Sequence, residues 1–230
     1  MIRLHQFEIS PFCDKVRRIL HWKRQPYEIR EVPLAQALTA VKKVNPAGKL
    51  PCLEHDGRFV ADSTDIAFYL EEKFPDPPLV PRDPKLRALC HVLEDWADES
   101  LYFYEMYLRF TLPHNAKRNI PLLTAHDPGW MKTAAGFVVP GMMRGVLGRQ
   151  GLGRKTLPAV VRDVERHADA VAGLLGQGEW LVGDALSLAD LSVFAELVCI
   201  RGSDEGARIL EGHPAIVAWM ARVDRATAKP

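Results

Sequence analysis

The sequence has little cysteine, and its cysteines do not pair at short spacing. Cys13, Cys52, Cys90 and Cys199 lie far apart in a chain of 230 residues and form no CxxC pair. This pattern is typical neither of a disulfide-rich secreted domain nor of a zinc-binding domain. Reduced thiols in a cytoplasm are the simplest interpretation, and no metal is expected.

A secretory signal, a membrane-spanning run and an excess of one charge are also missing. The N-terminal segment MIRLHQFEISPF carries charge from its third residue and has no apolar core. The apolar stretches are short and interrupted by Gly, Pro and Arg, so no bilayer span is predicted. Thirty basic residues against 29 acidic ones leave a net charge of +1. We therefore expect a cytoplasmic protein with no nucleic-acid or membrane partner.

The first 80 residues alternate between strand-type and helix-type runs, which implies a small mixed sheet with helices packed on it. A hairpin is expected at Asp56-Gly57, because this pair suits positive φ. The predicted strands are Ile2–Phe7, Tyr27–Val32, Pro51–His55 and Arg58–Val60, and the predicted helices are Pro11–Lys23, Ala35–Val44 and Ser63–Phe74.

Residues 75–84 contain five prolines, which predict a stiff linker between a domain of residues 1–78 and a second domain of residues 84–230. Apolar residues recur at helical spacing throughout the second domain. Ser187 and Asp190 form a capping-box signature, and Pro214 suits the first turn of a last helix. Between residues 111 and 156, Gly and Pro interrupt any long helical period.

Three features of the first domain could carry chemistry. Ser10-Pro11-Phe12-Cys13 lies at a strand–helix junction, where free helix N–H groups favour anions and thiolates. Pro51 starts a strand, and a cis bond before it would turn the backbone of Leu50 outward to pair with a peptide-like ligand. Asp62-Ser63 precedes a helix and could hold an amino-acid head group. Each has an ordinary alternative: Ser10 and Ser63 as simple N-caps, and Pro51 as an ordinary strand start.

Together, in this order, these features resemble the cytosolic glutathione transferase family. The resemblance includes SPFCDKVRRIL, NPAGKLPCLEHDGRFVADSTDIAFYLEEKFP, GDALSLADLSVFAEL and HPAIVAWMARV, and so covers nearly the whole chain. It implies an α/β thioredoxin-like N-terminal domain followed by an all-α helical bundle. It also implies glutathione as co-substrate, a small hydrophobic electrophile, a homodimer and a role in detoxification.

The resemblance assigns roles to particular residues. Ser10 would be the catalytic hydroxyl, and Leu50 with a cis Pro51 would hold the cysteinyl backbone of glutathione. Asp62 and Ser63 would bind the γ-glutamyl group, and Lys49 the glycyl carboxylate, although a lone surface lysine is more often solvated. Asp62 is shorter than the Glu or Gln usual in the family.

The SPFC start also resembles the CPFC start of glutaredoxin-like and omega-type proteins, and tau-type relatives share the serine. Ser10 then stands where their nucleophilic cysteine would be, and Cys13 takes the resolving position. Cys13 is either a redox residue or, as we favour, a buried core cysteine. A thiol reductase is disfavoured because Ser10 cannot form a mixed disulfide.

Two further expectations concern the second substrate. Phe12 and the aromatic cluster Tyr102, Tyr104, Met106 and Tyr107 are placed to line an electrophile pocket, with core or dimer packing as the alternative. Residues 101–158 hold eight Lys or Arg against two acids, which suggests either a solvated basic loop or a pocket biased toward anionic electrophiles. A non-catalytic binding or interaction module of the same fold remains the alternative to an enzyme.

Overall fold

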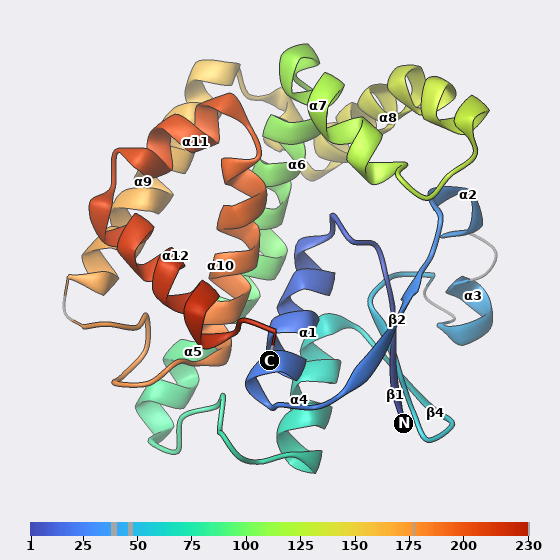
Figure 1. The fold of residues 1–230 in the computed structure, drawn as a ribbon. Coiled ribbons are helices and arrows are strands. Elements are labelled where there is room, and N and C mark those ends of the chain that lie inside the picture. Colours follow the sequence, from blue (N-terminus) through green and yellow to red (C-terminus); the bar gives the residue numbers. More distant parts are fainter. Residues whose placement is uncertain (38–40, 46–47, 177, 230) are drawn as a thin grey trace.

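The computed structural model describes residues 1–37, 41–45, 48–176 and 178–229. Figure 1 shows a small sheet with its helices beside a larger body built entirely of helices. The N-terminal elements are β1 Ile2–Gln6, α1 Pro11–Trp22, β2 Tyr27–Glu31, α2 Leu34–Ala37, α3 Val41–Val44, β3 Cys52–His55, β4 Arg58–Ala61 and α4 Ser63–Lys73. They are followed by α5 Pro84–Trp96, a π-helical turn η1 Ala97–Leu101, α6 Tyr102–Phe110, α7 Pro113–Leu123, α8 Gly129–Gln150, a 3-10 turn η2 Leu152–Arg154, α9 Leu157–Leu175, α10 Leu188–Arg201, α11 Asp204–Glu211 and α12 Pro214–Ala226.

The sheet has the strand order β2-β1-β3-β4, with β1 parallel to β2 and antiparallel to β3. β3 and β4 form the expected hairpin, whose turn residues Asp56 and Gly57 have φ values of 49° and 82°. All four strands match their predicted ranges to within one residue at each end. The mixed sheet with helices confirms the predicted thioredoxin-like fold class.

Two helices connect the sheet to the rest of the molecule. α1 buries Val16, Ile19 and Leu20 and packs against both α4 and α10, so it is shared by the sheet and the helical body. α4 buries Ile66 and Leu70 on the same side. The apolar core therefore continues from the sheet into the helices without a break, and the loops at the N-termini of α1 and α4 face the helical body.

The capping box predicted at the start of α10 is confirmed and forms a buried hydrogen-bond centre. The Asp190 carboxylate accepts hydrogen bonds from the backbone N–H of Ser187 and Leu181 and from Nε1 of Trp219, each at 2.9 Å. The Ser187 hydroxyl also donates to Asp190 at 2.7 Å. These bonds join α10, the preceding loop and α12 at one fully buried carboxylate.

The helix expected over 35–44 is described at its two ends, as the four-residue helices α2 and α3, and residues 38–40 lie outside the described residues. One sequence prediction about helices was wrong. The expected interruption of residues 111–156 is absent, because α7 and α8 run through Pro121 and Pro140. A proline removes the bond to the carbonyl four residues earlier, and for Pro140 that residue is the exposed Gly136, whose carbonyl water can satisfy.

Among the described residues, no helix combines the length and apolar character needed to cross a membrane.

We expect Asp190→Ala to lower the free energy of unfolding by about 3–5 kcal/mol, because it leaves several buried donors unpaired. Asp184→Ala, an exposed aspartate on the adjoining loop, should change it by no more than about 0.5 kcal/mol. Urea unfolding followed by circular dichroism measures both. Equal stabilities for the two variants would contradict a central role for the Asp190 carboxylate.

Candidate active site

A cavity of about 710 Å³ lies between the sheet loops and the helical body. Its walls come from the loop after β1, the segment before β3, the start of α4, the continuous α5–η1–α6 helix and Met142 and Met143 of α8. The π-helical turn η1 contributes Asp98 and Glu99, and such turns occur often at functional sites.

The cavity brings together most of the residues predicted from sequence. Its lining includes Ser10, Phe12, Lys49, Leu50, Pro51, Asp62, Ser63, Tyr102 and Met106. Three others lie outside that lining: Cys13, Tyr104 and Tyr107.

Ser10 occupies the N-cap position of α1, in extended backbone conformation. Its carbonyl accepts the first intrahelical bond from Asp14 at 3.0 Å, but its hydroxyl makes no capping hydrogen bond to the helix. Pro11 takes the first helical position, where its missing N–H costs nothing. Ser10 therefore lines the cavity next to the positive end of α1, and its hydroxyl is not used as a cap.

Cys13 lies one turn further along α1 and is fully buried. Burial raises the pKa of its thiol to about 11, against smaller opposing contributions from the Phe7 backbone and the Ser10 hydroxyl. Because the thiolate is the reactive form, this environment suits a core cysteine better than a redox residue. All four cysteines are buried, and none of them forms a disulfide.

The Leu50–Pro51 peptide bond is cis, as expected. The β1–β3 ladder ends at the pair His5–Cys52, so Leu50 and Pro51 lie just beyond it, at the edge of the sheet that faces the cavity. Lys49 is exposed at the cavity mouth, and its carbonyl accepts a hydrogen bond from Asn45 Nδ2 at 2.7 Å. The preceding Pro46 and Ala47 lie outside the described residues.

The interpretation of Ser63 as an N-cap was wrong, because Asp62 has that role. Asp62 has a φ of 75°, and its carboxylate accepts a hydrogen bond from the Thr64 N–H at 2.9 Å. Ser63 is the first residue of α4 and is buried, and its hydroxyl donates to Asp98 at 3.2 Å. Both residues still line the cavity.

Sequence analysis missed a buried ion cluster beneath the cavity. Lys15 Nζ lies 2.5 Å from Glu94 and 2.7 Å from Asp98, and is almost completely buried. Burial alone would lower the pKa of Lys15, but the two carboxylates raise it above its ordinary value. Burial also raises the pKa of Asp98, against the effect of Lys15.

The sequence contains a signal for this cluster. Lys15 falls on the apolar face of α1, four residues before Ile19, where a lysine needs a buried partner. Glu94 and Asp98 are four residues apart on one helix and could supply that partner together. The sequence does not show, however, that these two helices meet.

The predicted aromatic cluster divides between two surfaces. Tyr102 stacks on Phe12 with ring centroids 4.8 Å apart, which joins α6 to the start of α1 inside the cavity. Tyr104 instead donates to Asp163 at 3.4 Å and packs edge-on against His167. Because successive helical residues point about 100° apart, one helix cannot turn all of these rings to the same cavity. Tyr104 and Tyr107 are therefore not part of the cavity lining.

The expected basic bias of the pocket is also not seen in its lining. Of the eight basic residues in 101–158, only Arg109 lines the cavity, and it is paired with Glu105 at 2.9 Å. Arg118 and Lys155 form ion pairs elsewhere, with Asp204 and Asp163. Within the part of the chain that the structure describes, seven carboxylates line the cavity against two basic side chains: Asp62, Asp65, Glu94, Asp95, Asp98, Glu99 and Glu105 against Lys49 and Arg109.

Two family models match the chain. The glutathione S-transferase N-terminal domain matches residues 4–78, and the glutathione S-transferase C-terminal domain matches residues 139–225. The first match contains the sheet and the sheet side of the cavity.

Individual proteins of the same family are also similar to this chain. Glutathione S-transferase 1 of Dianthus caryophyllus is 42% identical over 91 residues, which span 38% of this chain and 41% of that protein. A probable maleylacetoacetate isomerase of Caenorhabditis elegans is 29% identical over 193 residues, 83% of this chain and 74% of that protein. A glutathione S-transferase structure from Rhodospirillum rubrum F11 has a TM-score of 0.71 and 26% identity, and covers 97% of this chain and 88% of its own. The chain belongs to the glutathione S-transferase family.

Proposed function

We propose that this protein is a glutathione-dependent transferase in which Ser10 activates the glutathione sulfur for attack on a small electrophile. One observation supports this most directly: Ser10, the sheet edge at Leu50–Pro51 and the start of α4 all line one cavity. Relatives named as glutathione S-transferases favour the same activity. Conjugation, reduction, dehalogenation and isomerisation are the candidate reactions of the activated sulfur.

Each part of the tripeptide has a plausible partner in this cavity. The backbone of Leu50, beyond the end of the β1–β3 ladder, suits the cysteinyl backbone as an added strand. The start of α4, with Asp62 and Ser63, suits the ammonium and carboxylate of the γ-glutamyl group. Lys49 at the mouth suits the glycyl carboxylate. We assign the sheet-side residues 1–78 to glutathione and residues 84–230 to the second substrate.

The chemical step requires a thiolate at neutral pH. A free thiol with a pKa of about 8.5 is only about 3% ionised at pH 7, and a pKa of about 6.5 would make roughly three quarters of it thiolate. Two features favour the charged form of the thiol: a hydroxyl that donates a hydrogen bond to the sulfur, and the positive end of a nearby helix. Ser10 combines these two features, because its hydroxyl is not used as a helix cap.

We expect Ser10→Ala to raise the pKa of the bound glutathione thiol by about one to two units and to lower turnover at neutral pH about ten- to a hundredfold. Glutathione binding should persist, since Leu50, Asp62 and Ser63 are unchanged. A pH titration of thiolate absorbance, with each protein saturated with glutathione, measures the shift.

Cys13→Ala is the matched control, one turn further along α1. Because the Cys13 thiol is buried with a raised pKa, its removal should leave the titration midpoint unchanged. Identical titration midpoints for the wild type and Ser10→Ala would contradict the proposal that Ser10 activates the glutathione sulfur. A loss of turnover seen only in Cys13→Ala would indicate that the Cys13 thiol, and not Ser10, is the reactive group.

The carboxylate-rich lining indicates the class of electrophile. Arg109 pairs with Glu105, and Lys15 pairs with Glu94 and Asp98, so the excess negative charge on the second-substrate wall formed by α5, η1 and α6 comes from Asp95 and Glu99. Such a field attracts cations and repels anions. Neutral or cationic aromatic electrophiles therefore fit the cavity better than carboxylated ones.

We expect an aryl halide with an ammonium substituent to react with a higher kcat/KM than its carboxylated counterpart. This preference should shrink when the ionic strength rises from about 0.01 M to about 0.1 M, because the Debye length falls from about 30 Å to about 10 Å. Initial rates with both substrates at both salt concentrations measure it. A preference for the carboxylated substrate would contradict the proposal. Glutathione binding without turnover of either would favour the non-catalytic module.

A homodimer is part of the proposal, and the structure offers a surface for it. Phe68 of α4 and Leu89 and Val92 of α5 are exposed together, and Phe68 packs against His91 with ring centroids 5.3 Å apart. A second concavity of about 550 Å³ adjoins them on α5 and η1. Exposed apolar side chains beside a concavity are typical of an interface between subunits. We also propose a cytoplasmic location, because reduced cysteines are typical of that compartment and none of the four forms a disulfide.

We expect Val92→Glu to convert a dimer to a monomer at micromolar concentration, because it places a carboxylate in the apolar contact. Val217→Glu on α12 is the matched control, since this valine is also exposed but lies on another face. Sedimentation velocity distinguishes the two. A wild-type monomer, or a Val92→Glu dimer, would contradict this interface.

A further inference from the structure

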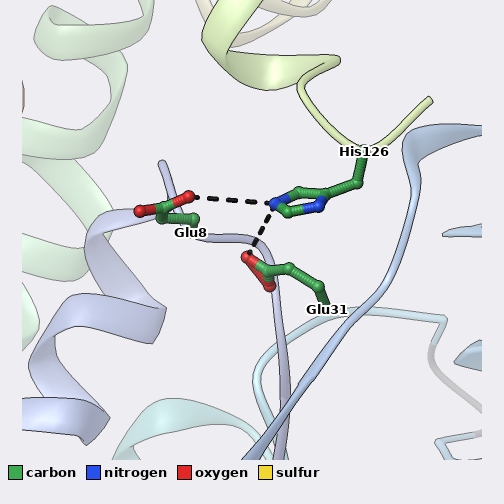
Figure 2. A group of neighbouring side chains, drawn as sticks. All are labelled: Glu8, Glu31 and His126. Atoms are coloured by element: carbon green, nitrogen blue, oxygen red, sulfur yellow. Dashed lines mark ion pairs between the residues drawn. The ribbon is translucent and has the colours of Figure 1, made fainter.

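Three side chains from separate segments meet beside the cavity, as Figure 2 shows. Glu8 comes from the loop between β1 and α1, Glu31 ends β2, and His126 lies between α7 and α8. His126 Nε2 is 3.8 Å from a carboxylate oxygen of Glu8 and 3.8 Å from Oε1 of Glu31. One ligand atom from each of the three residues lies within 4.8 Å of the others.

The fold holds two of these residues in place independently of one another. Glu31 pairs with Gln6 in the parallel β1–β2 ladder. His126 is fixed by its neighbour Asp127, whose carboxylate accepts hydrogen bonds from the N–H groups of Leu34 at 2.9 Å and Ala35 at 2.8 Å. The segment that carries His126 is therefore held to the segment that follows Glu31 by contacts that involve neither of these two side chains.

A second observation concerns the Glu31 carboxylate. Its Oε2 atom is buried and has no hydrogen-bond partner, while Oε1 accepts a long bond of 3.4 Å from Gln6. Buried carboxylate oxygens without partners are rare, because each one loses its hydration without compensation. In addition, two carboxylates carry two negative charges, whereas one imidazole carries at most one positive charge, so the three side chains together have a net negative charge. Both features point to a bound cation.

We propose that Glu8, Glu31 and His126 bind a divalent transition-metal ion, for which Zn²⁺ is the probe. One imidazole nitrogen and two carboxylates are ligands that Zn²⁺ accepts, at about 2.0–2.2 Å each. Zn²⁺ is tetrahedral, and ligand atoms at these distances lie about 3.4 Å apart, so each 3.8 Å separation from His126 must close by about 0.4 Å. The side chains of His126 and Glu8 are 49% and 74% exposed and are free to make this movement.

A metal here would join the two halves of the molecule at the cavity. Glu8 is two residues from Ser10, and Leu34 and Leu123, near the other two ligands, line the cavity. The ion would fasten the α7–α8 loop to the loop that carries Ser10. Three protein ligands also leave a coordination position open to water or another small ligand. This site is separate from the proposed glutathione site and does not depend on it.

Equilibrium dialysis against ZnCl2, without glutathione, tests the proposal with three proteins. Compared with His126→Ala, the wild type should bind one more equivalent of Zn²⁺, or should bind Zn²⁺ at least about tenfold more tightly. His114→Ala is the matched control: its side chain and that of His126 are both 49% exposed and both lie near a glutamate. This control should behave as the wild type. Thermal unfolding should show a Zn²⁺-dependent rise in Tm for wild type and His114→Ala, and none for His126→Ala.

Two results would overturn the site. If wild type and His126→Ala bind Zn²⁺ equally, the three residues form only a solvent-exposed ion pair, of the kind that contributes little and is screened by salt. If His114→Ala loses as much binding as His126→Ala, the metal is held by scattered surface histidines. Glu31→Gln provides a second variant with little change in shape, and it should weaken Zn²⁺ binding while its circular dichroism spectrum matches the wild type.

Discussion

The buried ammonium of Lys15 is the interaction on which the candidate active site depends. It lies between Glu94 and Asp98 of the helical body while its own helix, α1, belongs to the sheet side. Removing one partner from a buried ion pair typically costs about 3–5 kcal/mol, because the remaining charge is left unpaired. The contact therefore fixes the distance between α1 and the α5–η1 helix, which are the two walls of the cavity.

The same cluster determines what Ser63 can do. Its hydroxyl donates to Asp98, and Lys15 lies 3.5 Å away, so this residue is part of the cluster as well as of the cavity wall. A ligand carboxylate at the start of α4 must then rely on backbone N–H groups and share the hydroxyl with Asp98. The ligand's ammonium meets a more favourable field, because Asp62, Asp65 and Asp98 all line the cavity.

Sequence reasoning succeeded where local chemistry decides the structure. The Asp56-Gly57 hairpin, the capping box of Asp190 and the strand boundaries follow from φ preferences and side-chain patterns within a few residues. It failed where the structure depends on contacts between segments that are far apart in the sequence. The Lys15 cluster needs two helices 79 positions apart in sequence to meet, and the continuity of α8 through Pro140 depends on solvent reaching an exposed backbone. The cavity residues were predicted through family resemblance, whereas their carboxylate-rich surroundings became visible only in three dimensions.

Those surroundings make the position of Ser10 more important. Nearby carboxylates disfavour a thiolate and raise its pKa, so the lining opposes the ionisation that glutathione chemistry needs. The opposing contribution must come from the N-terminus of α1 and from a hydroxyl that can donate to the sulfur. Ser10 is placed where both act together, and its hydroxyl is not used to cap α1. A cavity that attracts cationic or neutral electrophiles can thus still hold a thiolate, provided that the anion stays within reach of this one helix end.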